Sequence, residues 1–207
     1  SLVENSIFAQ NSVVGFNLDG AANSTVTGNK FVDNGANGAG ANRSHGTTLE
    51  KNTFANNNAA GFETRGSYCT SYCTVSHVKV THTENFTFHD NIIDDSNLGR
   101  TSSDPDNVRL YQTTGFWCDE GCIDAKIVRN FFTNVPHAIF YEVSDSGIIA
   151  SNIIESGGRG IGISGSSNVK IYNNTISRTA LPIVLREDNR IDGCNSYNSA
   201  TKTCTTA

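Results

Sequence analysis

An internal repeat of 22 residues constrains the fold of this chain more than any other feature of its sequence. Asn130, Asn152 and Asn174 are 22 residues apart, and Ile139, Ile161 and Ile183 keep the same spacing. Each asparagine has an apolar residue three positions before it and another two positions after it: Ile127 and Phe132, Ile149 and Ile154, Ile171 and Ile176. A period of roughly 20 to 25 residues with short apolar strands and Asn- or Gly-rich turns is typical of a solenoid.

The pattern continues into the first half of the chain with looser spacing. Four further copies are Asn5 with Leu2 and Ile7, Asn29 with Val26 and Phe31, Asn52 with Leu49 and Phe54, and Asn91 with Phe88 and Ile93. Two insertions stretch the spacing, at roughly residues 66–84 and 95–112. We therefore expect seven copies, each forming one coil of a solenoid.

The repeat favours an all-β, right-handed parallel β-helix with a core shared by stacked coils. A leucine-rich repeat has the same period but requires several leucines per copy, and this chain has few. Coils would stack at the strand spacing of ~4.8 Å. The repeated asparagine can bond its side-chain amide to the next coil, so we assign it a structural role and no catalytic one. We expect the β-helix to occupy residues 1–193 and a loop closed by cysteines to occupy residues 194–207.

Charge and hydropathy exclude several classes of partner. The net charge is −5 and no stripe of lysine or arginine is present, which argues against nucleic acid as a partner. No apolar run reaches the length of about 18 residues that a membrane span requires, so we expect no membrane partner. No charged-then-apolar leader opens the chain, which favours a mature form, a domain or a fragment.

The six cysteines fall into three local pairs: Cys69 with Cys73, Cys118 with Cys122, and Cys194 with Cys204. An even number of cysteines in local pairs favours disulfides and an oxidising compartment, so we expect a secreted, extracellular protein. Reduced thiols are one alternative. A zinc site built from the two CxxxC pairs is another, although the usual CxxC spacing of zinc sites is absent.

A second strand in each copy shows which side chains point outward. Six such segments align, with a large apolar residue in second place: 15–19, 61–65, 115–119, 138–142, 160–164 and 182–186. Strand side chains alternate between faces, so the second and fourth positions point inward and the third and fifth outward. A slip of one residue would expose six large apolar side chains.

This alignment predicts an exposed patch of aromatic and charged side chains around the segment "GFWCDEGC" (115–122). Trp117 would lie beside Phe140, and Asp119 beside Glu142. Sugar rings have apolar faces that stack on aromatic side chains, and their hydroxyl groups bond to carboxylates. We therefore predict a glycan-binding face with Trp117 and Phe140 as the stacking platform. Arg65 is the expected charge partner one coil away, and the remaining outward substrate-binding residues are Glu63 and Arg186.

The paired carboxylates allow three interpretations. Two carboxyl groups about 5 Å apart match a retaining glycosidase, with Asp119 and Glu142 as the acid and the nucleophile. Alternatively, the pair could hold Ca²⁺ in a lyase, where the ion would neutralise a uronate and Arg65 would help to abstract a proton. In a third interpretation, Arg65 bridges the pair, which then only ties neighbouring coils together.

The segments "NVKIYNNTIS" (168–177) and "GIIASNIIESGGRGIGIS" (147–164) resemble the secreted right-handed β-helix proteins of the pectate-lyase-like superfamily. The stretch from "GFWCDEGC" to "VRNFFTNVPHAIFYEVS" (128–144) resembles a segment of carbohydrate-active bacterial β-helix proteins. The resemblance implies a secreted protein that binds a linear glycan and cleaves it as a glycosidase or lyase. Because the superfamily also contains adhesins, the alternative is a non-catalytic structural or adhesive module that associates end to end.

Overall fold

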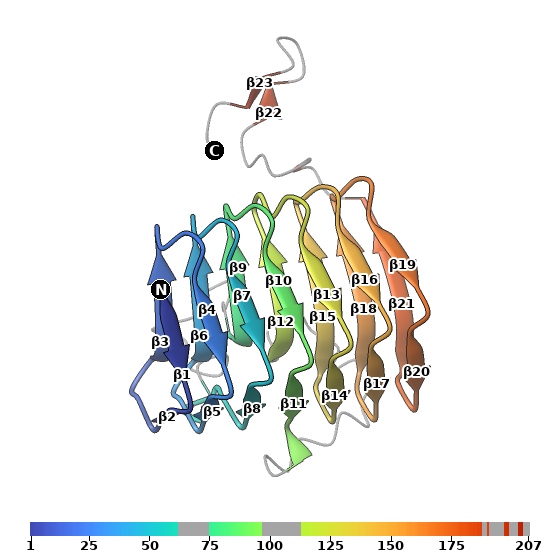
Figure 1. Cartoon of the computed structure of the whole chain (residues 1–207). Helices are drawn as coiled ribbons and strands as arrows, with labels where there is room; N and C mark the ends of the chain where they lie inside the picture. Colours follow the sequence, from blue (N-terminus) through green and yellow to red (C-terminus); the bar gives the residue numbers. More distant parts are fainter. Residues whose placement is uncertain (62–74, 97–112, 188–189, 191–196, 199–202, 205–207) are drawn as a thin grey trace.

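The chain forms a parallel β-helix in a computed structural model (Figure 1). The structure describes residues 1–61, 75–96, 113–187, 190, 197–198 and 203–204. Three parallel sheets of seven strands run the length of the solenoid, and each coil contributes one strand to each sheet. This arrangement confirms the predicted fold class and the expected seven coils.

The three sheets are named here A, B and C. Sheet A contains β1 (Leu2–Glu4), β4 (Thr25–Thr27), β7 (Thr48–Glu50), β10 (Thr87–His89), β13 (Lys126–Val128), β16 (Ile148–Ala150) and β19 (Lys170–Tyr172). Sheet B contains β2 (Ile7–Ala9), β5 (Lys30–Val32), β8 (Thr53–Ala55), β11 (Ile92–Asp94), β14 (Phe131–Thr133), β17 (Ile153–Glu155) and β20 (Thr175–Ser177). Sheet C has longer strands, namely β3 (Val14–Asp19), β6 (Asn37–Asn42), β9 (Ser76–Thr81), β12 (Thr114–Asp119), β15 (His137–Glu142), β18 (Arg159–Ser164) and β21 (Leu181–Arg186).

Single residues in the left-handed backbone conformation turn the chain from sheet A to sheet B. This corner column has φ between 51° and 66° and consists of Asn5, Gly28, Lys51, Asp90, Arg129, Ser151 and Asn173. Asparagine, aspartate and glycine tolerate this conformation best, which explains the polar, Asn-rich turns of the sequence. The backbone amide of each of the first six corners then bonds to the next coil, as Asn5 does to the carbonyl of Thr27.

A ladder of asparagines, buried except for the half-buried Asn174 at its end, follows directly after this corner. In each step the backbone and side-chain amides of one asparagine donate to Oδ1 of the asparagine one coil further on, as Asn52 does to Asn91 at 2.9 and 3.1 Å. The ladder contains Asn29, Asn52, Asn91, Asn130, Asn152 and Asn174. The structural role predicted for these residues is confirmed, because they satisfy backbone groups that a corner leaves unpaired.

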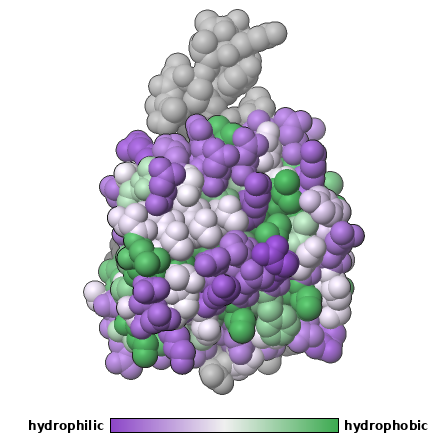
Figure 2. All heavy atoms as spheres, in the orientation of Figure 1, coloured by the Kyte–Doolittle hydropathy of each residue, from purple (hydrophilic) through white to green (hydrophobic). Residues whose placement is uncertain are grey.

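Aromatic and aliphatic side chains stack along the inside of the solenoid. The rings of Phe8, Phe31 and Phe54 stack at centroid distances of 5.0 and 4.8 Å from coil to coil. Phe116 and Ile139 are buried at the inward positions predicted for sheet C. The face turned to the viewer in Figure 1 is mostly polar with separated apolar groups, as Figure 2 shows.

In the first coil, the expected register is wrong by one residue. β1 aligns Val3 with Val26, and β2 aligns Phe8 with Phe31, so Ser6 rather than Asn5 stands level with Asn29. The predicted inward residues Leu2 and Ile7 are instead 61% and 69% exposed. The repeat is 23 residues long here, and aligning on the nearest asparagine hid the one-residue shift because Asn5 occupies the corner itself.

In the third coil, the strand predicted for sheet C is wrong. The place between β6 and β12 belongs to β9, whose Val78 and Val80 point inward, and not to residues 61–65. Both long connections therefore leave sheet B and return to sheet C, between β8 and β9 and between β11 and β12. The Gly-Phe pair at 61–62 matches the start of the other sheet C segments, which led to the wrong assignment. The alternation of apolar and polar residues in "HVKVTH" was the correct signal for this strand.

The β-helix strands extend from Leu2 to Arg186, within the predicted solenoid. A separate antiparallel pair, β22 (Tyr197–Asn198) and β23 (Thr203–Cys204), lies in the segment predicted to form a closed loop. Cys194 is outside the described residues, so closure of this loop by Cys194 and Cys204 stays a prediction. In the part of the chain that the structure describes, we find no helix with the length and hydropathy of a membrane span.

Candidate functional site

The candidate site lies on the outer face of sheet C, where three columns of side chains cross the strands. The first column contains Lys79, Trp117, Phe140, Gly162 and Val184. The second contains Thr81, Asp119, Glu142, Ser164 and Arg186, and the third includes His137 and Arg159. The predicted neighbours Trp117 and Phe140, and Asp119 and Glu142, are confirmed as register partners across β12 and β15.

The aromatic pair is buried, which corrects the expectation of an exposed stacking platform. Trp117 and Phe140 are only 7% and 4% exposed, and their ring centroids lie 5.6 Å apart. The ammonium nitrogen of Lys79 lies 3.6 Å from the centre of a Trp117 ring, and the ring of His137 packs 4.8 Å from that of Phe140. Alternation along a strand predicts which way a side chain points, but it does not show what packs over it.

Each carboxylate of the predicted pair contacts a cation. Nζ of Lys79 donates to Oδ2 of Asp119 at 2.7 Å, although Lys79 is the register partner of Trp117 and Thr81 stands level with Asp119. Nε1 of Trp117 donates to Oε2 of Glu142 at 3.1 Å, and Arg190 donates to its Oε1. Both carboxylates are buried, and one oxygen of Asp119, Oδ1, makes no hydrogen bond within the described part of the chain.

Glu142 is held closer to its protonated form than an exposed glutamate. Burial raises the pKa of Glu142, and the neighbouring negative charge of Asp119 raises it further. Arg190 and the indole N–H of Trp117 act in the opposite direction, because both stabilise the carboxylate. The two carboxyl groups therefore have different environments, as an acid paired with an ionised partner requires.

Two more titratable residues lie at this face. From the sequence, His137 is expected to be a structural turn residue that could also orient Glu142, whereas Arg159 was missed. Burial lowers the pKa of His137 well below its usual value, and the positive charges of Arg159 and Arg186 lower it further. Burial and the nearby Arg186 also lower the pKa of Arg159. Their position one residue before the aligned segments was the available signal, since both begin six-residue strands of sheet C.

The other predicted site residues have separate outcomes. Arg186 lies on the outer face, where its Nε donates to Oγ of Ser164 at 2.9 Å. Tyr141, at the fourth position of the segment 138–142, is buried in the core, as predicted for that inward position. Glu63 and Arg65 lie outside the described residues. Cys118 and Cys122 form the predicted disulfide. Two of the expected cysteine partners, Cys69 and Cys73, are also outside the described part.

The carboxylate pair does not fit the calcium hypothesis in this arrangement. Lys79 and Arg190 contact the oxygens that would have to bind Ca²⁺. Across the described residues, no cluster of three or more His, Cys, Asp or Glu side chains is arranged for a metal ion. Calcium prefers six or more oxygen ligands, and we derive no chemical step through it.

Three parallel sheets stacked coil upon coil define the protein as a parallel β-helix solenoid, with a buried group of titratable side chains on one outer face. The sequence model of the family described as "Right handed beta helix region" matches residues 1–132 and 114–205. The chain belongs to this family. A search of curated proteins found no match.

Proposed function

We propose that this protein is a secreted enzyme that acts on a polysaccharide at the outer face of sheet C. The observation that carries the proposal is the pairing of Asp119 with Glu142 across β12 and β15, in two different electrostatic environments. Perturbed titratable groups are characteristic of catalytic sites, and His137, Arg159 and Glu142 gather on this one face. The disulfide between Cys118 and Cys122 supports an oxidising compartment.

The roles follow from the environments of the two carboxyl groups. Glu142, whose pKa is raised, is the general acid that protonates the oxygen of the leaving sugar. Asp119, paired with Lys79, supplies the negative charge that attacks or stabilises the anomeric carbon. Carboxyl groups on adjacent coils match the retaining glycosidases, in which they stand about 5 Å apart. Since Arg190 contacts Oε1 of Glu142, a glycan reaches this oxygen only when Arg190 is displaced.

An activity screen with matched variants tests the proposal. The protein would be incubated with neutral and uronic-acid polysaccharides, and products would be read by mass and by absorbance of unsaturated uronates. Glu142→Gln and Asp119→Asn should each lower turnover by about 10²- to 10⁴-fold. Glu155→Gln is the control, because Glu155 is a surface glutamate of sheet B paired with Arg178. Full activity of both site variants on a proven substrate would refute the assignment.

The saturation state of the products separates hydrolysis from elimination. A product that has gained water indicates a glycosidase and agrees with the roles given to Asp119 and Glu142. An unsaturated product indicates a lyase, in which a base removes a proton from the sugar ring. In that case the assignment of Glu142 as the acid would have to be replaced.

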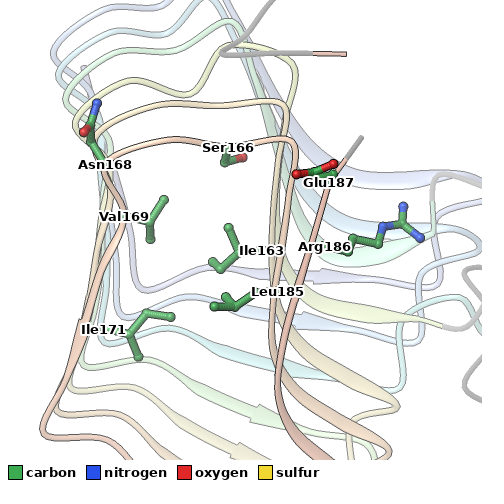
Figure 3. Close-up of a pocket in the computed structure, with 8 residues that line it drawn as sticks. All are labelled: Ile163, Ser166, Asn168, Val169, Ile171, Leu185, Arg186 and Glu187. Carbon is green, nitrogen blue, oxygen red and sulfur yellow. The ribbon is translucent and has the colours of Figure 1, made fainter. Parts of the chain in front are cut away.

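A structural or adhesive module is the second candidate, favoured by the coil formed by β19, β20 and β21. Its inward residues Ile183 and Leu185 are 48% and 69% exposed. A hollow of about 630 Å³ lies at this end of the core. Figure 3 shows Ile163, Ile171 and Leu185 directed into it. Such a surface offers apolar side chains to another coil, together with the edges of β19, β20 and β21, which end their sheets among the described strands. Both features support end-to-end association.

One substitution in this coil tests self-association independently of turnover. Leu185→Lys should abolish concentration-dependent self-association, measured by sedimentation velocity, because it places a charge in the apolar contact. The same variant should leave turnover unchanged if the enzyme proposal is correct. Wild-type protein that stays monomeric at high concentration would refute the second candidate.

A further inference from the structure

We propose that His137 and Arg159 form a binding site for one oxyanion, the carboxylate or sulfate group of an acidic sugar, on the outer face of sheet C. The inference rests on the proposed function and deepens it, because it assigns a charge to the glycan. The site is distinct from the pair of Asp119 and Glu142. It lies at the opposite end of the strands, where β15 and β18 begin.

The strand register brings the two side chains together. His137 and Arg159 are Cα partners on adjacent coils, so they stand side by side at the start of β15 and β18. The ring of His137 packs on Phe140 and extends over Gly162, where a Cβ atom would lie only 2.7 Å from Nε2. The glycine at position 162 thus leaves the space that the imidazole occupies.

Both side chains keep a buried nitrogen without a hydrogen-bond partner. Among the described residues, neither Nε2 of His137 nor Nε of Arg159 makes a hydrogen bond. His137 is only 8% exposed, so water reaches its ring poorly. Buried polar groups are nearly always paired in folded proteins, and an orphaned pair on one face indicates a ligand that is polar itself.

The local charge determines which kind of ligand fits. Lys79 and Arg190 are paired with Asp119 and Glu142, whereas no carboxylate within the described ranges lies at ion-pair distance from Arg159. Arg186 adds a second positive charge near Arg159 and His137, as the lowered pKa of each shows. A guanidinium binds planar or tetrahedral oxyanions well, so a negatively charged oxygen group completes the site.

The oxyanion site and the carboxylate pair lie on the same strands. The Cα atoms of His137 and Glu142 are five residues apart on β15, about 16 Å at the rise of a strand. The imidazole extends from this position over Gly162, toward the carboxylate pair. One glycan lying along the outer face of sheet C can therefore contact both sites.

Binding of small anions to the full chain tests the site without requiring turnover. Sodium glucuronate and sodium sulfate are titrated separately, with glucose as the neutral probe, and the ring signals of His137 are followed by NMR. Either anion should bind more tightly than glucose and raise the pKa of His137, because its charge offsets that of Arg159. The anion that binds more tightly shows whether the site prefers a carboxylate or a sulfate group.

Two variants and one control complete the test. Arg159→Gln should weaken anion binding by about tenfold to a hundredfold and abolish the change in the pKa of His137. Gly162→Ala should also weaken binding, because its methyl group displaces the imidazole. Arg178→Gln, which removes an exposed arginine of the far sheet B surface, should have no effect. Equal binding by wild type and Arg159→Gln, or glucose binding as tight as that of the anions, would overturn the inference.

The outcome is independent of the catalytic roles proposed for Asp119 and Glu142. The titration is repeated with Glu142→Gln, which should bind the anions as the wild type does. Retained binding together with unchanged turnover of the Glu142 variant would refute the catalytic role proposed for Glu142 and leave the oxyanion site intact. If Glu142→Gln loses turnover while Arg159→Gln binds the anions as tightly as the wild type, the catalytic role of Glu142 is supported and the oxyanion site is refuted.

Discussion

The ammonium group of Lys79 lies 2.7 Å from Oδ2 of Asp119 and 3.6 Å from the centre of a Trp117 ring. These contacts join β9 to β12, although 40 residues separate Lys79 and Asp119 in the sequence. The lysine therefore pairs with a buried carboxylate and also contacts the electron-rich face of the indole. It secures the coil that carries Trp117 and Asp119 to the coil before it.

Replacing Lys79 by methionine should destabilise the protein by about 3 kcal/mol. The substitution leaves the carboxylate of Asp119 buried without its cation, and breaking one side of a buried ion pair is strongly unfavourable. Urea unfolding followed by circular dichroism measures the loss. The double variant Lys79→Met with Asp119→Asn should recover most of it, because the remaining amide carries no charge. A double variant as unstable as the single one would contradict this account.

The stability of the protein should fall below about pH 6.5 because of His137. Its pKa is lowered in the folded state, so acid protonates the unfolded chain first and favours unfolding. The contribution of His137 to the free energy of unfolding should drop by up to about 1.4 kcal/mol per pH unit below this point, and be constant above it. His137→Gln should flatten this part of the profile, whereas His45→Gln, at an exposed site, should keep the wild-type slope. Identical profiles for all three proteins would be evidence against a buried neutral imidazole.

Asn91→Ala should cost about 3 kcal/mol of stability. The side-chain amide of Asn91 donates to the carbonyls of Leu49 and His89, and its Oδ1 accepts from both amides of Asn52. Removal leaves several buried backbone groups unsatisfied. The exposed Asn17 of β3 is the matched control, and its replacement by alanine should change stability by less than about 0.5 kcal/mol. Similar effects of the two substitutions on the urea midpoint would refute the role of the ladder.

Neighbouring residues in β2 test the corrected register of the first coil. Phe8→Ala should destabilise the protein by about 2–3 kcal/mol, because the Phe8 ring stacks 5.0 Å from Phe31 in the core. Ile7→Ala should have little effect, since Ile7 points to solvent. Thermal unfolding of both variants gives the comparison. The reverse order of effects would support the register expected from the alignment on Asn5.

Loss of the disulfide between Cys118 and Cys122 should cost about 2 kcal/mol. The bridge closes a loop of only five residues, so the entropy that it removes from the unfolded chain is small. The double variant Cys118→Ala with Cys122→Ala is compared with the wild type by urea unfolding in the absence of reductant. A loss of 5 kcal/mol or more would show that the bridge does more than restrict the unfolded chain.

Sequence periodicity predicted the fold because each coil repeats the same physical requirements. A buried asparagine pairs with its neighbour at every step, and inward residues such as Ile139 and Ile161 must be apolar in each copy. The prediction failed where local sequence imitated the pattern. The segment 61–65 has the apolar spacing of a sheet C strand, but β9 occupies that place, and Asn5 resembles a ladder residue while forming a corner.

The sequence alone therefore determined the fold class, the number of coils, the inward columns of the last four coils and the pairing of Asp119 with Glu142, since all of these follow from a repeat that stacks on itself. Only the tertiary structure decided the partners of that pair. Lys79 reaches Asp119 from across a long connection, and Arg190 reaches Glu142 from 48 residues away. Which residues make these contacts depends on where the chain returns to the sheet after a connection. The repeat within a coil does not predict that position. The burial of His137 beside Arg159 was decided in the same way, by packing between coils.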